Sequence, residues 1–248
     1  MGAPGALDVL IVSLGSTPGL RSADAELAGS IERAGAAVAI ATATPPPRVR
    51  TMMLTDLLWA RAARAAAQSR LRCPGSEPRA IVYSSTTAAL FWPRPGAIRF
   101  DAPAAANRPG RDGLWQRPLE RRRLAEAPLL LPLSAGGLAE VPPGASAGGR
   151  ALVLGLVAEP SGEPGGERDI TAITYAANPR KKGLDRVLAA WRALRSQPGA
   201  PAHGELLVAG ASPEELSAAG IALERESGVR SVGRMERTAY RSLLRRID

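Results

Sequence analysis

The sequence has one cysteine and one histidine in 248 residues, and each scarcity excludes a class of site. A lone Cys73 cannot form a disulfide within the chain or a multi-cysteine zinc site. A lone His203 excludes a metal site built from several histidines. We therefore expect no resident metal or cofactor. His203 follows Pro201-Ala202 in a turn and is expected at the surface.

Aromatic residues and long apolar runs are also scarce. Phe, Trp and Tyr make up 4% of the chain, which argues against a protein that stacks successive bases of a single-stranded nucleic acid. No apolar run approaches the roughly 20 residues that a membrane-spanning helix needs. The segment from Met1 to Leu14 contains Asp8 and lacks the basic start of a signal peptide. These absences predict a soluble, cytoplasmic protein.

The formal net charge is +9, and only Lys181 and Lys182 among the 32 Lys and Arg residues are lysines. The densest basic run, Arg121 to Arg123, is flanked by Glu120 and Glu126 and is expected to form a solvated helix face. Nucleic-acid-binding proteins usually concentrate their cations on one face, so we expect no nucleic-acid partner. A diffuse positive field would instead favour anionic substrates, or peripheral contact with an anionic membrane surface.

Short apolar segments alternate with helical patterns through the first half. A strand over 8–14 is followed by a glycine-bearing loop, and Ser22 is expected to cap a helix that ends near Ala34. A second strand at 37–41 completes a βαβ unit. Further strands are expected at 80–83, 97–100 and 128–133, and helices at 52–68 and 115–125. This alternation predicts an α/β fold with a doubly wound parallel sheet.

A second α/β unit follows a linker-like composition between Pro142 and Gly149. Strands are expected at 173–176, 206–209 and 229–232, with helices starting near 183, 213 and 238. The predicted domains are therefore 1–145 and 146–248. Three strands are few for such a domain.

The turn after the expected strand 173–176 is the most informative stretch. Arg180, Lys181 and Lys182 precede Gly183, which opens an amphipathic helix. Ligands of open α/β sheets bind at the carboxyl ends of strands, and a helix N-terminus offers N–H groups and a positive dipole end. The turn is therefore a candidate anion site. A solvated basic loop is the alternative.

The motifs of the second half occur in a specific order. Lys182-Gly183-Leu184-Asp185 leads into an apolar helix that includes Ala190-Trp191, a strand follows at 206–210, and Val232-Gly233-Arg234-Met235 precedes Thr238-Ala239-Tyr240. In order and spacing these pieces resemble the donor domain of the retaining GT-B glycosyltransferases, the glycosyl transferases group 1 family. The first half resembles the family's acceptor domain more loosely, through its glycine-bearing loop.

This resemblance implies two Rossmann-like domains that face each other across a cleft, the GT-B architecture. It implies a nucleotide-sugar donor held mainly by the second domain and a sugar or lipid acceptor. The implied residues are Lys182, Lys181, Arg180 and Gly183 for the donor diphosphate, Gly233, Arg234 and Met235 for the nucleobase loop, and Gly15, Ser16, Thr17 and Gly19 for the cleft loop.

Two departures from the family pattern bear on the implied site. The family's arginine five positions before Lys182 is replaced by Ala177, so Arg180 or Lys181 would have to substitute for it. The family's paired-glutamate segment would follow Asp248, so the resemblance implies an incomplete second domain. The implied activity is metal-independent sugar transfer with retention, without an assigned catalytic residue. The alternative is a non-catalytic α/β module that binds an anion or serves in assembly.

Overall fold

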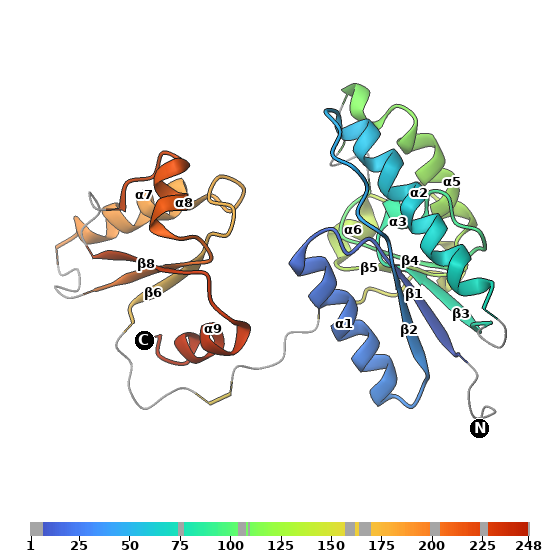
Figure 1. The fold of residues 1–248 in the computed structure, drawn as a ribbon, viewed down its shortest axis with the longest axis horizontal. Helices are drawn as coiled ribbons and strands as arrows, with labels where there is room; N and C mark the ends of the chain where they lie inside the picture. Colours follow the sequence, from blue (N-terminus) through green and yellow to red (C-terminus); the bar gives the residue numbers. More distant parts are fainter. Residues whose placement is uncertain are drawn as a thin grey trace. The chain divides into compact units, whose positions relative to one another are not determined.

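A computed structural model describes residues 7–73, 77–103, 108, 110–156, 162–163, 170–198, 204–223 and 228–247. Contacts within the chain divide it into two compact units, Met1–Ala158 and Glu159–Asp248 (Figure 1). Each unit contains a parallel β-sheet flanked by helices. The predicted α/β class is therefore confirmed.

The first unit contains a five-stranded sheet in the order β2-β1-β3-β4-β5, with every pair parallel. Its strands are β1 (Val9–Ser13), β2 (Val38–Thr42), β3 (Ala80–Tyr83), β4 (Ala97–Phe100) and β5 (Leu130–Pro132). Its α-helices are α1 (Pro18–Arg33), α2 (Met52–Leu71), α3 (Thr86–Ala89), α5 (Gln116–Glu126) and α6 (Ala135–Ala139). Two 3-10 helices cover Gly110–Gly113 and Ala147–Gly149.

The central strand β1 explains why this sheet is covered on both faces. Leu10 and Val12 pack into the larger core with residues of α2, α3 and α5, whereas Ile11 packs into a smaller core with α1. All three side chains are 0% exposed. A strand buried on both faces requires a continuous apolar run, as the sequence of β1 provides.

Ser and Thr side chains cap the starts of five helices. In α1 the capping residue lies earlier in the chain than predicted. Thr17 caps α1 by accepting the N–H of Leu20 at 3.2 Å, and Pro18 occupies the first helical position. A Thr-Pro pair favours this earlier start, so Ser22 lies inside the helix and its predicted capping role is wrong. Gly19 likewise belongs to the first turn of α1 and not to a loop.

The basic run of α5 is only partly solvated, contrary to expectation. Glu120 is 3% exposed, and the Arg123 guanidinium lies 5.0 Å from the ring centre of Trp92. Arg121 and Arg122 are exposed. The turn of a helix places neighbouring residues on different faces, so one basic run contributes both to solvent and to the core.

The second unit contains a three-stranded parallel sheet in the order β6-β7-β8. The strands are β6 (Ala172–Tyr175), β7 (Leu206–Ala209) and β8 (Val229–Gly233), and the helices are α7 (Leu184–Arg195), α8 (Pro213–Ala218) and α9 (Arg237–Leu244). In Figure 1, α7 and α8 cover one face of this sheet, and α9 lies on the other side. A single parallel bridge also joins Ile170 to Ile247.

The unit boundary falls after Ala158, later in the chain than the predicted division after residue 145. Residues beyond 145 stay with the first sheet because their backbone pairs with β5. The N–H of Leu152 donates to the carbonyl oxygen of Leu130 at 2.9 Å, and that of Leu154 donates to Pro132 at 2.9 Å. The segment therefore extends the edge of the five-stranded sheet.

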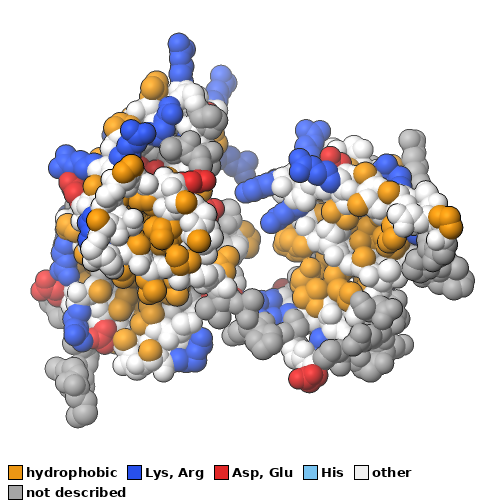
Figure 2. Space-filling model, turned by 180° about the vertical axis from the view of Figure 1, so that it is seen from behind, with side chains coloured by type: hydrophobic (Ala, Val, Ile, Leu, Met, Phe, Trp, Pro, Cys, Tyr) orange, Lys and Arg blue, Asp and Glu red, His pale blue; other side chains and the backbone are white. Residues whose placement is uncertain are grey.

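In the part of the chain that the structure describes, no helix combines the length and apolarity needed to cross a membrane. Lys and Arg side chains are dispersed around the first unit on the face that Figure 2 shows. Among the described side chains on this face, the basic ones of the first unit form no continuous stripe.

The α7 helix anchors the second core and supplies a matched pair of leucines. Leu188 is 3% exposed, whereas Leu194 on the same helix is 39% exposed. Leu188→Ala should lower the free energy of unfolding by about 2–5 kcal/mol because it leaves a cavity, and Leu194→Ala should change it by no more than about 0.5 kcal/mol. Urea unfolding followed by fluorescence measures both, since Trp191 belongs to the same core. Equal effects would contradict the packing described.

Candidate functional site

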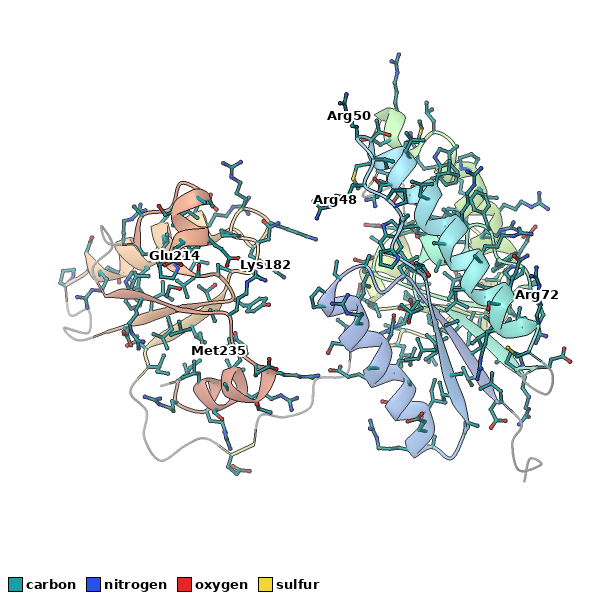
Figure 3. The ribbon with its side chains drawn as sticks, in the orientation of Figure 1. Arg48, Arg50, Arg72, Lys182, Glu214 and Met235 are labelled. Atoms are coloured by element: carbon teal, nitrogen blue, oxygen red, sulfur yellow. The ribbon has the colours of Figure 1, made fainter. Side chains whose placement is uncertain are left out.

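The carboxyl ends of β6, β7 and β8 lie at one edge of the second sheet. Parallel pairing continues past the strand ends, because Ala176 N–H donates to Ala209 O and Gly210 N–H donates to Gly233 O, both at 2.7 Å. The loops that follow the three strands therefore start side by side. Lys182 and Met235 both lie at this end of the unit (Figure 3).

The turn between β6 and α7 presents its cations to solvent. Arg180, Lys181 and Lys182 are all exposed. The turn is held by Asn178, whose side-chain Oδ1 accepts the N–H of Lys181 at 3.1 Å and whose carbonyl accepts the N–H of Lys182 at 2.9 Å. An anion would therefore meet flexible side chains on a turn of fixed backbone.

The backbone amides at the start of α7 are largely committed within the protein, and this corrects the expectation that they converge on a ligand. Leu184 N–H donates to Pro179 O at 3.0 Å, and Arg186 N–H donates to Gly183 O at 3.0 Å. Gly183 has φ +66°, a conformation that favours glycine. Its role is to turn the chain into the helix, and any anion binding must rest on the neighbouring side chains.

The loop after β8 is held by an ion pair. The Arg234 guanidinium donates to both carboxylate oxygens of Glu215, at 2.6 and 3.3 Å, and this holds the pKa of Glu215 below its ordinary value. Glu215 also forms a capping box with Ser212 at the start of α8. Arg234, predicted for the nucleobase loop, thus joins that loop to α8.

Gly233 leaves room beside the same loop. Its N–H donates to Ser231 Oγ at 3.1 Å, and a Cβ at this position would meet nothing within 4 Å. Met235 is half-buried. The position that a side chain would occupy at Gly233 is therefore open.

Tyr175 also lies at this edge and is not among the predicted site residues. It is 49% exposed at the end of β6, and its ring contacts that of Tyr240 edge to face at 5.9 Å between centres. A Cβ on Gly210 would lie 2.8 Å from the Tyr175 ring. The available signal was an aromatic residue at the last position of a strand, directly before a basic turn.

Charge along this edge is uneven. Arg180, Lys181 and Lys182 follow β6, whereas Glu214 and Glu215 occupy the first turn of α8 after β7. A hydrogen bond from the Ser212 side chain lowers the pKa of Glu214, so its carboxylate stays charged at neutral pH. The β6 side therefore favours an anion, whereas on the β7 side Arg234 compensates Glu215 and only Glu214 disfavours one.

The predicted cleft loop belongs to the first unit and is shorter than expected. Gly15 has φ +59°, its N–H donates to Ser13 Oγ at 3.0 Å, and its carbonyl accepts Arg21 Nη1 at 2.7 Å. Ser16 is exposed, and Thr17 already caps α1. The loop proper is therefore 14–16.

A buried polar cluster lies behind this loop. Ser13 donates a hydrogen bond to Asp24, and Arg99 Nη1 lies 3.5 Å from Asp24 Oδ1. Burial raises the pKa of the Asp24 carboxyl, and this is opposed by hydrogen bonds from Ser13 and Ser84 and by the charge of Arg99. Residues from β1, α1 and β4 thereby fix Ser13 and, through it, Gly15.

The predicted site residues thus divide between the two units. Lys182, Lys181, Arg180 and Gly183 lie on one turn, and Gly233, Arg234 and Met235 lie on a second loop at the same edge. His203 lies outside the described residues. Among those that are described, no group of three or more His, Cys, Asp and Glu side chains is arranged to hold a metal ion.

No protein-family model and no curated protein matches the chain. Among solved structures, the chain is similar to the crystal structure of the glycosyltransferase SnogD from Streptomyces nogalater. The alignment has a TM-score of 0.41 and 17% identity, and covers 92% of this chain and 69% of that chain.

Gly210 and Gly220 provide a matched test of the packing beneath Tyr175. Both have positive φ, +95° and +81°, so alanine is strained at either position. Only at Gly210 would the new Cβ also lie 2.9 Å from the backbone nitrogen of Ala177. We expect Gly210→Ala to destabilise the second unit by about 1–3 kcal/mol more than Gly220→Ala, measured by urea unfolding. Equal losses would show that Gly210 is needed only for its φ.

Proposed function

We propose that the chain is a glycosyltransferase that uses a nucleotide-sugar donor, and that the second unit holds the donor diphosphate. The observation that carries the proposal is the exposed cationic turn Arg180–Lys182 at the carboxyl end of β6, directly before α7. A lysine ammonium offers three donors to phosphate oxygens. Because the turn's backbone is fixed by Asn178, the cations project from a defined base.

The proposed nucleoside lies toward the neighbouring loop. Gly233 leaves open space, and Tyr175 presents a half-exposed ring near Arg234, whose pKa is raised chiefly by its hydrogen bond to Glu215 and slightly by Tyr175. An aromatic ring can stack on any nucleobase, because every base has a π-face. This arrangement supports a diphosphate at the β6 turn and a base toward β8.

In the proposed reaction, the bond between the sugar's anomeric carbon and the diphosphate oxygen breaks. The same carbon forms a bond to an acceptor hydroxyl oxygen, whose proton goes to the leaving diphosphate. Negative charge develops on the leaving diphosphate, and nearby cations stabilise it most where water is excluded. Lys182, with Lys181 or Arg180, is proposed to supply that stabilisation.

Replacing Lys182 tests the proposal directly. Lys182→Ala should raise the Kd of UDP, GDP or ADP about tenfold, because a charge-assisted hydrogen bond to phosphate is lost. Lys182→Arg should retain most of the affinity. Arg195→Ala, at the opposite end of α7, should have little effect. Isothermal titration of the full chain measures all four proteins.

Two outcomes would contradict the diphosphate role, and a third would favour the second candidate function. If none of the three nucleotides binds, or if Lys182→Ala binds as tightly as the parent, the diphosphate role is wrong. If a nucleotide binds in a Lys182-dependent manner but no nucleotide sugar is ever turned over, the second candidate is favoured. That candidate is a non-catalytic module that binds an anion or serves in assembly.

Retention and metal independence are proposed on the family resemblance, and one assay addresses both. With a panel of UDP-, GDP- and ADP-sugars in excess EDTA, we expect release of the nucleoside diphosphate at an unchanged rate. NMR of the glycoside product should show the anomeric configuration of the donor. Loss of turnover in EDTA, restored by magnesium, would contradict metal independence, and an inverted product would contradict retention.

A further inference from the structure

A cavity of about 320 Å³ lies in the first unit, between α5 and two loops. One loop follows β4 and contributes Pro103, and the other follows α6 and contributes Glu140 to Pro143. Parallel strands place the end of β4 at the same edge of the sheet as the Gly15 loop. The cavity is therefore at the edge where ligands of α/β sheets bind.

Five of the nine residues that line the cavity are apolar. Leu124 is 1% exposed and Val141 is 9% exposed, and three prolines complete this lining. A flat group with C–H bonds could displace water from such a surface favourably. The cavity therefore requires a ligand with an apolar face.

The charges that line the cavity balance. Glu120 and Glu140 oppose Arg117 and Arg121, and the Arg117 guanidinium also donates to two backbone carbonyls of the preceding 3-10 helix. Arg108, which is not among the lining residues, donates to both oxygens of Asp56 at 2.7 and 3.2 Å, so its charge is already compensated. A doubly charged phosphate would face two carboxylates, and a cation would face two guanidinium groups. A neutral ligand avoids both penalties.

The hydrogen-bonding capacity of the lining residues further restricts the class of ligand that can bind. Carboxylates only accept hydrogen bonds and guanidinium groups only donate them. A ligand that serves both must carry groups that donate and accept, and hydroxyl groups do so. We propose that this cavity binds one neutral monosaccharide ring, with its hydroxyl groups toward Glu140 and Arg121 and its C–H face toward Leu124 and Val141.

The volume agrees with one ring and not with a whole nucleotide sugar. Small-ligand cavities range from about 300 to 1,000 Å³, and this one is at the lower end. The inference rests on the proposed function only in naming the bound sugar as the acceptor. The cavity and its chemistry belong entirely to the first unit, so its test is separable from that of the diphosphate turn.

Ligand-observed saturation-transfer NMR on the full chain tests the proposal with glucose, galactose, mannose, N-acetylglucosamine and myo-inositol. We expect at least one of these to bind with a millimolar Kd. Arg121→Gln and Glu140→Gln should each raise that Kd about tenfold, through loss of a charge-assisted hydrogen bond. Arg122→Gln is the matched control, since Arg122 is exposed on the same helix and pairs with Glu126 at 2.7 Å.

Charged analogues of the best-binding sugar test the charge balance. An amino sugar and a uronic acid should both bind more weakly than the neutral parent. Absence of binding by the whole panel at 20 mM, equal effects of Arg121→Gln and Arg122→Gln, or tighter binding of either charged analogue would overturn the proposal.

Failure of this proposal is distinguishable from failure of the proposed function. Lys182→Ala should leave monosaccharide binding unchanged, and Arg121→Gln should leave nucleotide binding unchanged. Sugar binding without nucleotide binding would retain the cavity assignment and remove the transferase proposal. Nucleotide binding without sugar binding would contradict the cavity assignment and leave the transferase proposal in place.

Discussion

Parallel strand pairing is the constraint on which both candidate sites depend. Every strand pair in the two sheets is parallel, so each strand must be followed by a crossover and all carboxyl ends meet at one edge. Lys182 and Met235, 53 residues apart in numbering, lie at the same end of the second unit for this reason. The same rule brings Pro103 and Gly15 to one edge of the first sheet. Any ligand site at the carboxyl edge of either sheet is therefore built from loops that the parallel pairing places side by side.

The positions of the strands could be predicted from the sequence because buried parallel strands leave a distinctive pattern. The strands expected at 97–100 and 206–209 coincide with β4 and β7, since both segments are bounded by turn residues and are too short for a helix. The start of α1 could not be placed by apolar periodicity. It depends on which residue caps the helix. Thr17, directly before Pro18, is the cap, and Ser22 lies inside the helix.

The candidate site was predicted as a set of residue types, but not as a set of contacts. Sequence order places Lys182 before a helix, yet it does not show that Asn178 has already engaged the backbone of that turn. Nor does it pair Arg234 with Glu215, because such contacts form only when β8 lies beside β7. For the same reason Glu120, part of an apparently solvated basic run, is buried.

The backbone N–H groups of the turn between β6 and α7 already donate hydrogen bonds within the protein. This changes the kind of anion site that the turn can form. A nest of free amides holds an anion by fixed geometry, whereas exposed ammonium groups hold it by charge in a medium of high dielectric constant, where each contact contributes little. Lys182 becomes effective only when a ligand displaces water from around it. Tyr175 offers the apolar surface over which such displacement is favourable, and Gly210 allows the ring to lie close to the turn. In the proposed function, the aromatic and the cationic residues would act together, because a base stacked on the ring would strengthen the hold on its phosphates.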